Sequence, residues 1–323
     1  MSALDALAEA DQDRIVEAGP PAHAAPMKAV LTDRRFSDPG WIFERKLDGI
    51  RCIAIRDGAS VRLLSRNDLP LDDRYPEIAA AVAAASCERF TIDGEVVAFD
   101  GRQTSFALLA RRKQFHVPVF LYAFDLLWLD GFDVRRLPLR SRKRLLRRGV
   151  GLAEPIRVNQ YRNERGEELF AEACRKGWEG LIAKRAASTY TARRSRDWLK
   201  LKCEQGQELV IGGYTDPKGA RSRFGALLLG HWEDGELRYA GRVGTGFDEA
   251  TLESLGRRLE QLAVPASPFA DPRSIDVKGA HWVDPVLVAE IGFTEWTRDG
   301  RLRHPRFLGL RDDKAAAEVV REQ

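Results

Sequence analysis

The sequence predicts an α+β fold in two parts, a domain built on antiparallel sheet followed by a small β-barrel. Three observations predict it: short apolar strands separated by turns, a few helices between them, and a change near residue 203 to shorter strands with Gly and Asp turns. A chain of 323 residues is long enough for two domains that each bury a core. We expect a flexible or peripheral leader at residues 1–26, a first domain at residues 27–203 and a second at residues 204–323.

The first domain shows hairpin strands with helices between them. WIFERKLDG, IRCIAIR and VRLLSR have strand character, and Asp57-Gly58 between the last two is a strong hairpin signal. Further strands are expected at FTIDGEVVAF, PVFLYAFDLLWLDG, EGLIAKR and DWLKLK. Helices are expected near residues 77–85, 141–148 and 167–176. Strands and helices intermixed with hairpins indicate antiparallel sheet.

The second domain has shorter strands with Gly and Asp turns. QELVIGGYTDP, FGALLLGHWEDG, ELRYAGRV and PVLVAEIGFTEWTRDG are interrupted by a single helical segment near residues 248–262. This pattern fits a five-stranded barrel of the oligonucleotide-binding type. The joint is expected at Cys203 to Gly206, where the glycine can absorb a change of dihedral angle.

The composition indicates a globular protein of the cytoplasm. Hydrophobic residues make up 44% and charged residues 31%, and no apolar run approaches the roughly 20 residues of a membrane span. The N-terminus has no basic segment followed by an apolar one, so it does not predict a secretion signal. The four cysteines form no CxxC pair, which argues against a zinc ribbon. We expect them to be reduced thiols that pack in the interior: Cys52, Cys87, Cys174 and Cys203.

Basic residues gather in two places although the net charge is only +4. The stretch Arg135–Arg148 (RRLPLRSRKRLLRR) contains no acid. A solvated helix face normally interleaves both signs, so contact with a phosphate backbone is the favoured interpretation and a solvated helix the alternative. A second cluster comprises Arg193, Arg194, Arg196, Lys200 and Lys202.

The segment Glu44–Arg51 (ERKLDGIR) carries a candidate nucleophile, Lys46. At an ordinary pKa near 10.4, only about one lysine in 10³ to 10⁴ is neutral at pH 7, so nearby cations or burial must lower the pKa. Arg45, Arg51 and a bound Mg²⁺ are expected to do so. Asp48-Gly49 would turn the chain and leave Lys46 at a strand end. Taken alone, the segment fits a surface strand ending in a turn equally well.

Six motifs follow one another along the chain. They are Lys46–Arg51, Ser65–Asn67, Ile92–Glu95 with Phe124–Asp125, Glu179–Lys184, Trp198–Lys202 and His304–Lys314. Through them the chain resembles the covalent nucleotidyltransferases, the family of DNA ligases, RNA ligases and capping enzymes. FERKLDGIRC, IDGEVVAF and RHPRFLGLRDDK look most like the ligase module of bacterial end-joining repair ligases. The resemblance implies an adenylation domain followed by an OB-fold domain, and an ATP-dependent DNA ligase.

The resemblance also implies a mechanism. Lys46 takes AMP from ATP as a phosphoramidate and passes it to the 5′-phosphate of a nick, and the 3′-hydroxyl then displaces AMP. Glu44 would read the adenine amine, and Arg66 would contact the ribose or the 5′-phosphate. Phe124 would stack on adenine, although an ordinary core position beside Tyr122 is the alternative.

Phosphate and metal contacts complete the expected site. Glu95 and Glu179 are hard carboxylate ligands suited to hydrated Mg²⁺, with Mn²⁺ as the alternative ion. Lys200 and Lys202 share one face by the period of a strand and would hold the α-phosphate, although an ordinary amphipathic strand has the same pattern. In the sixth motif Arg311 and Lys314, oriented by Asp313, would contact the pyrophosphate when the barrel closes. The expected nucleotide contacts are Glu44, Arg51, Arg66, Glu95, Phe124, Glu179, Lys184, Lys200, Lys202, Arg311 and Lys314.

The absence of nucleotide-binding motifs of other enzyme classes narrows the range of possible functions. The sequence has no GxxxxGK[ST] loop and no GxGxxG after a strand, so it predicts neither a P-loop nor a Rossmann enzyme. NAD-consuming ligases of the family carry additional domains, so ATP is the expected cosubstrate. An RNA ligase, a capping guanylyltransferase and a silent nucleic-acid-binding module remain the alternatives. We expect nicked or broken duplex DNA as partner, a monomer that does not bind membranes, and as a hypothesis a Ku-like end-binding protein.

Overall fold

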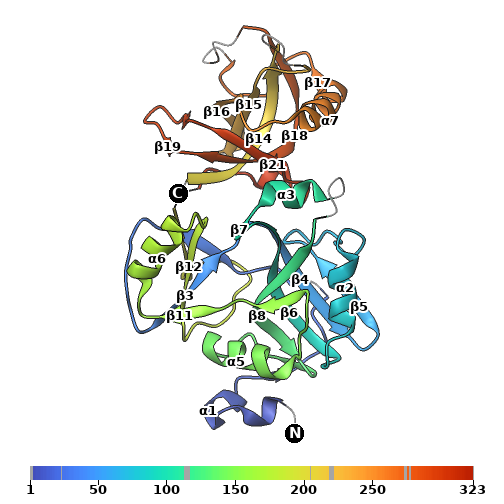
Figure 1. Ribbon diagram of the computed structural model, residues 1–323, viewed down its shortest axis with the longest axis vertical. Coiled ribbons are helices and arrows are strands. Elements are labelled where there is room, and N and C mark those ends of the chain that lie inside the picture. The colour runs from blue at the N-terminus through green and yellow to red at the C-terminus, as the bar shows by residue number, and fades with distance from the viewer. Residues whose placement is uncertain are drawn as a thin grey trace. The chain divides into compact units, whose positions relative to one another are not determined.

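The computed structural model describes residues 3–22, 24–112, 117–203, 205–217, 222–272, 275 and 278–322 (Figure 1). It divides into two compact units, Met1–Cys203 and Glu204–Gln323. Among the described residues no helix is long and apolar enough to span a membrane. Each unit has its own core of buried aliphatic and aromatic side chains.

The first unit contains an eight-stranded sheet. Its order is β1 (Val16–Glu17), β9 (Phe132–Asp133), β8 (Val119–Leu129), β6 (Arg89–Asp100), β4 (Ile50–Asp57) and β5 (Ser60–Leu64), with β7 (Gln103–Thr104) on β6 and β10 (Ile156–Val158) on β8. All of these ladders are antiparallel except that of β10. The expected hairpin at Asp57-Gly58 is confirmed, since Asp57 pairs with Ser60. The helices are α2 (Pro76–Ala83), α3 (Phe106–Ala110) and α5 (Leu139–Gly149).

A second, five-stranded sheet of this unit carries Lys46. Its order is β11 (Tyr161–Asn163), β3 (Trp41–Lys46), β12 (Gly180–Arg185), β13 (Arg194–Lys202) and β2 (Lys28–Leu31). Helix α6 (Gly166–Arg175) lies beside β3 and β12 (Figure 1). Leu169 and Phe170 of that helix pack with Phe43, Leu181 and Leu201 of the sheet. One face of this sheet therefore packs in the core against α6, and the opposite face carries the side chain of Lys46.

The N-terminal segment corrects a prediction. It forms η1 (Ala3–Ala6), α1 (Glu9–Gln12) and β1, and η1 contacts α5. Leu4 and Leu7 are buried in the main core, and Ser141 donates a hydrogen bond of 2.5 Å to Asp11. The prediction of a flexible or peripheral leader is wrong for this segment, because two leucines three residues apart place apolar surface against α5.

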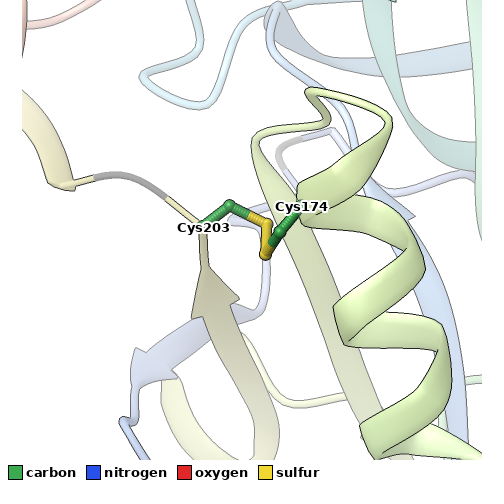
Figure 2. The surroundings of a disulfide bond; sticks show 2 residues. All are labelled: Cys174 and Cys203. Carbon is green, nitrogen blue, oxygen red and sulfur yellow. A yellow bond between two sulfur atoms is a disulfide. The ribbon is translucent and has the colours of Figure 1, made fainter.

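The cysteines correct a second prediction. Cys174, near the end of α6, and Cys203, directly after β13, form a disulfide with Cα atoms 5.3 Å apart (Figure 2). Reduced thiols were expected at both positions because they are 29 residues apart in sequence. The packing of α6 against the sheet brings them together. Cys52 is buried and Cys87 half-buried, and both are free thiols.

The second unit is a curled antiparallel sheet with one long helix. The order is β16 (Glu236–Val243), β15 (Leu227–Glu233), β14 (Gln205–Thr215), β18 (Ala280–Phe293) and β17 (Ala263–Val264), with β21 (Arg306–Leu310) also on β18. Helix α7 (Glu249–Gln261) begins at Asp248, whose carboxylate accepts from the Thr251 amide at 2.8 Å. The shorter elements are β19 (Glu295–Trp296), β20 (Leu302–Arg303) and η3 (Ala316–Glu318). The predicted fold class is confirmed, with the two-residue β17 added to five longer strands.

Candidate active site

The register of β3, β12 and β13 assembles the candidate site around Lys46. Lys46 lies opposite Gly180, which lies opposite Lys202. Two residues along, Glu44, Ile182 and Lys200 form the next row. Cross-strand partners and alternate residues share a face of a sheet, so one face presents the nucleophile with predicted partners from all three strands. The members predicted from sequence on this face are Glu44, Lys46, Lys184, Lys200 and Lys202.

Two glycines allow the backbone to approach closely at this face. A Cβ on Gly49 would lie 2.1 Å from the carbonyl oxygen of Val96. Gly180, directly after Glu179, has φ +150°, and a Cβ there would lie 1.9 Å from the Leu201 carbonyl oxygen. Both positions therefore require glycine. The turn after Lys46 is held by Asp48, whose carboxylate accepts from the Phe106 amide at 3.0 Å.

Acidic neighbours dominate the field at Lys46. Its ammonium donates a hydrogen bond to Glu179, and the two side chains are 20% and 27% exposed. Burial lowers the pKa of Lys46, but the charge and hydrogen bond of Glu179, with the charges of Asp48 and Glu95, outweigh burial and hold the pKa above its ordinary value. Lys46 is therefore the protonated member of an ion pair with Glu179.

This field corrects the prediction that Arg45 and Arg51 lower the pKa of Lys46. Arg45 points to the other face of β3, where its guanidinium lies 4.7 Å from the centroid of the Trp178 ring. Arg51 is neutralised by Asp93, to which it donates two hydrogen bonds of 2.5 Å. Alternation along β3 separates Arg45 from Lys46, and a bidentate ion pair removes the net charge of Arg51.

Asp93 is the centre of a buried network that orients Arg51. Its side chain is fully buried, and it also accepts a hydrogen bond of 2.7 Å from the Tyr190 hydroxyl. That hydroxyl accepts in turn from the Met27 amide at 2.9 Å. The Arg51 guanidinium lies 4.7 Å from the centroid of the Phe124 ring, within the range of a cation–π contact.

The two predicted metal ligands suit a hydrated divalent cation. Glu179 binds Lys46 through one oxygen, while its other oxygen, Oε2, is buried and accepts no hydrogen bond from the described part of the chain. Glu95 is half-buried, and its charge acts on both Lys46 and Arg51. No cluster of three or more His, Cys, Asp or Glu side chains with metal-binding geometry occurs among the described residues. Mg²⁺ commonly takes one or two carboxylates together with water and substrate phosphates, so this pair fits it.

Glu44 is held in a buried cluster of polar side chains. Lys143 contacts its Oε1 at 2.5 Å, and Lys184 contacts its Oε2 at 3.0 Å. Asn159 donates a further hydrogen bond of 3.0 Å to Oε2. Burial lowers the pKa of Lys184 to about 8; Glu44 opposes this shift and the charge of Lys143 adds to it. Lys184, expected among the nucleotide contacts, lies in this structure against Glu44.

Helix α5 corrects the interpretation of the basic stretch. Arg142 and Lys143 are buried, whereas Arg144 and Arg147 are exposed. Arg142 forms a bidentate pair with Asp125 at 2.7 and 2.9 Å. Burial raises the pKa of Asp125, but the charge and hydrogen bonds of Arg142 outweigh burial and hold this pKa below its ordinary value. Arg142 and Lys143 therefore fit neither interpretation of the basic stretch, contact with a phosphate backbone or a solvated helix face. Only the exposed arginines of the stretch remain available for DNA.

Phe124 and Arg66 occupy different surroundings from those predicted for nucleotide contacts. Phe124 is 8% exposed, and the Lys184 ammonium lies 4.2 Å from its ring centroid. Trp198 meets the Phe124 ring edge-on at 6.1 Å. Arg66 lies half-buried in the turn after β5, where Ser65 accepts a hydrogen bond of 3.1 Å from the Leu69 amide. Phe124 belongs to a buried cluster with Leu127 and Trp198, and its contact with adenine stays a prediction.

Comparison with known families decides among the nucleotidyltransferases. Residues 21–202 match the family described as "ATP dependent DNA ligase domain", and residues 220–314 match "ATP dependent DNA ligase C terminal region". The chain belongs to the ATP-dependent DNA ligases. These enzymes form phosphodiester bonds, and the alternatives of an RNA ligase or a capping enzyme receive no support from these matches.

Individual relatives agree with the family. The ligase is 41% identical over 292 residues to the "Multifunctional non-homologous end joining protein LigD" of Pseudomonas aeruginosa, across 88% of this chain and 35% of that protein. It is 40% identical over 286 residues to the protein of the same name from Mycobacterium bovis, across 87% and 37%. The chain thus spans about a third of the length of these curated relatives. The predicted resemblance to an end-joining ligase module is confirmed.

A solved structure covers nearly the whole chain. A "mycobacterial DNA ligase D complexed with ATP and MES" has a TM-score of 0.67 and 37% sequence identity, over 93% of this chain and 98% of that chain. That structure carries ATP, so ATP as the nucleotide of the family is supported.

The sixth motif of the ligase lies in the second unit and is described there alone. Arg311 is 8% exposed and forms a bidentate pair with Asp313, both bonds at 2.8 Å, and a bond of 3.0 Å to Glu290. Lys314 donates to Glu208 at 2.8 Å. Asp313 thus pairs with Arg311 and Glu208 with Lys314, so both residues predicted as phosphate contacts are paired with acids in this structure.

Sequence interpretation missed the residues that support Glu44 and Asp125, the neighbour of Phe124 in the chain. These are Arg142, Lys143 and Asn159. A signal for two of them was available, because Leu139, Arg142, Lys143 and Leu146 follow the spacing of one helical face. Basic residues at the apolar positions of a helix indicate buried ion pairs rather than a surface for DNA.

Proposed function

We propose that the chain seals nicks or breaks in duplex DNA during repair, through a covalent Lys46–AMP intermediate. The single observation that carries the proposal is the shared face of β3, β12 and β13. It gathers a lysine nucleophile, a buried carboxylate two residues away and three further lysines on β12 and β13. No single strand could supply this set.

In the first step the Lys46 amine attacks the α-phosphorus of ATP. A nitrogen–phosphorus bond forms, the bond from the α-phosphorus to the bridging oxygen breaks, and pyrophosphate leaves with the electron pair. Lys46 must first lose a proton. Lys46 carries that proton in the free enzyme and donates it in a hydrogen bond to Glu179, which is the nearest base to receive it. The nitrogen loses its second proton to solvent as the nitrogen–phosphorus bond forms.

The remaining residues position the nucleotide. Glu44 accepts a hydrogen bond from the adenine amine, which a guanine nucleotide lacks at that position, and Phe124 provides an aromatic surface for the base. Lys200 and Lys202 face the α-phosphate from β13, and Arg51, oriented by Asp93, contributes a further cation from β4. Arg66 contacts the sugar or the 5′-phosphate.

Glu95 and Glu179 are the residues that would hold Mg²⁺, or Mn²⁺ in its place. When bound, the ion neutralises charge that develops on the phosphate oxygens. The buried Glu179 oxygen without a hydrogen-bond partner among the described residues supports this assignment.

Two further displacements complete the reaction. A 5′-phosphate oxygen of the nick attacks the same phosphorus, forms an anhydride and returns the electron pair to the Lys46 nitrogen, which takes up a proton. The 3′-hydroxyl then attacks the DNA phosphate, loses its proton and releases AMP. Arg311 and Lys314 serve the first step, exchanging their acidic partners for the pyrophosphate.

The setting of the reaction is also proposed. The partner is nicked or broken duplex DNA, contacted by the exposed arginines of α5 and of the segment 193–196. The enzyme acts as a monomer in the cytoplasm, where bacterial chromosomal DNA lies. A Ku-like end-binding protein is a candidate partner because the curated relatives are named for non-homologous end joining.

Incubation with ATP labelled at the α-phosphate tests the proposal. The protein is first freed of bound AMP with pyrophosphate, then exposed to labelled ATP and Mg²⁺ and separated under denaturing conditions. Label on wild type and on Lys28→Ala, an exposed lysine of β2, but not on Lys46→Ala, supports the covalent step. Labelled protein is then offered a nicked duplex with a 5′-phosphate. Absence of label on wild type freed of AMP refutes the mechanism.

A further inference from the structure

We propose that Lys143, a buried residue of the basic helix α5, is a positioning residue that sets the preference of the site for an adenine nucleotide. It does so by joining Glu44 and the Phe124 backbone in one fixed arrangement. The inference rests on the proposed function, because it assigns to Glu44 and Phe124 the task of holding the base.

The contacts of Lys143 connect the two sheets of the first unit. Its ammonium lies 2.5 Å from Glu44 Oε1, on β3, and donates a hydrogen bond of 2.9 Å to the Phe124 carbonyl oxygen, on β8. The side chain is 1% exposed, as is that of Glu44. Strands β3 and β8 belong to different sheets, so this single group fixes the distance between the carboxylate and the aromatic residue.

The other partners of Glu44 make different connections. Lys184 and Asn159 both contact Oε2, whereas Lys143 forms an ion pair with Oε1, which accepts no hydrogen bond from the described residues. Lys184 comes from β12, the neighbour of β3 in the same sheet, and it reaches β8 only through the face of the Phe124 ring, 4.2 Å from its centroid. Asn159 also reaches β8, because its backbone amide donates a hydrogen bond of 2.7 Å to the Ala123 carbonyl. A different group, its side-chain amide, contacts Glu44.

The charges of the cluster place two lysines, Lys143 and Lys184, in competition for Glu44. Glu44 and Asp125 contribute two negative charges, and Arg142, Lys143 and Lys184 contribute three positive charges. The pKa of Lys184 is lowered to about 8 by burial in the first place and in part by the charge of Lys143. Without Lys143, Lys184 becomes the dominant cation at Glu44 and draws the carboxylate toward β12.

Loss of this tether displaces the carboxylate from its place beside the base. Misplacement of a contact by about 1 Å can cost about 100-fold in rate, so Lys143→Met should lower the ATP preference by about 10- to 100-fold. The comparison nucleotide is inosine triphosphate, which has an oxygen in place of the adenine amine. A change that only loosens the fold would lower the rates with both nucleotides equally and leave their ratio unchanged.

The experiment measures kcat/KM for labelling of Lys46 with ATP and with inosine triphosphate, using intact-protein mass spectrometry without DNA. The variants are Lys143→Met, Glu44→Gln, their double variant and the control Lys176→Met. Lys176 also pairs with a glutamate, Glu172 at 2.5 Å, but at an exposed site of α6. We expect the preference for ATP to fall in Lys143→Met, to be unchanged in the control, and to fall no further in the double variant than in Glu44→Gln.

The outcomes of this experiment distinguish failure of the inference about Lys143 from failure of the proposed function. An unchanged ratio in folded Lys143→Met, with a reduced ratio in Glu44→Gln, overturns the inference and leaves the proposed function intact. Absence of labelling of wild type by either nucleotide refutes the proposed function instead. If Lys143→Met does not fold, Lys143→Arg replaces it, because a planar guanidinium keeps the charge but not both short contacts. An unchanged ratio in that variant also overturns the inference.

Discussion

Glu179→Gln should lower the pKa of Lys46 and make its amine more reactive in the absence of nucleotide and metal. The two side chains form a hydrogen-bonded ion pair that is only 20% and 27% exposed. Replacement of the carboxylate by an amide keeps the shape and removes the charge. Burial, which by itself lowers the pKa of Lys46, is then opposed only by Asp48 and Glu95.

The size of the effect follows from the geometry. Opposite charges about 4 Å apart near a protein surface, at an effective dielectric constant of about 20, attract by about 4 kcal/mol. One pKa unit corresponds to about 1.4 kcal/mol, so the loss amounts to about 3 units at most. Partial exposure of both groups reduces it, and we expect a fall of about 1 to 3 units.

The assay is acetylation of Lys46 as a function of pH, followed by peptide mass spectrometry with exposed Lys28 as internal reference. Below the pKa, the reactivity of Lys46 should rise about 10- to 1000-fold in Glu179→Gln. The control is Glu168→Gln, which removes an exposed acid of α6. Superimposable titration curves for Lys46 in wild type and Glu179→Gln would show that the ion pair does not govern its protonation.

Three further predictions concern stability, each measured as the free energy of unfolding in urea. The pKa of Lys184 is lowered to about 8 from 10.5, so the unfolded chain binds more protons between these values and stability from this group rises with pH across that window. Lys184→Met should lose that rise, about 3 kcal/mol, when unfolding at about pH 7 and about pH 10 is compared. Arg142→Met leaves Asp125 as a buried unpaired charge and should cost about 3–5 kcal/mol, and a cost below about 1 kcal/mol would contradict this role. Cys174→Ser should cost about 3–4 kcal/mol under oxidising conditions, from the 29-residue separation of the bridge, and nothing under reducing conditions, with Cys87→Ser as unchanged control.

Much of the site could be predicted from local patterns. Motifs such as Lys46–Arg51 and Glu179–Lys184 are short, and their chemistry depends on residue types within one turn or strand. The glycines at positions 49 and 180 belong to these motifs, whereas the backbone contacts with Val96 and Leu201 that require them are seen only in the structure. The alternation of Lys200 and Lys202 likewise placed both amines on one face, because a strand has a period of two.

The charge state of these residues could not be predicted in the same way. Arg51 and Lys46 are five residues apart, yet each is paired with an acid from a distant part of the chain, Asp93 and Glu179 respectively. Coulomb energy depends on distance in space and on burial, and neither is a property of a local pattern. For the same reason the sequence suggested a lowered pKa for Lys46, and the structure shows a raised one.

The sequence by itself determined the order of motifs, the hairpins, the helices and the type of chemistry, because these depend on residue identity and on periods of 2 and 3.6 residues. Only the tertiary structure decided that Lys143 and Arg142 point inward, that Cys174 meets Cys203, and that the N-terminal segment packs on α5. Each of these joins segments at least 17 residues apart in the chain. Such contacts form because a folded core must bury apolar surface and pair every buried charge, and that requirement acts on the whole chain at once.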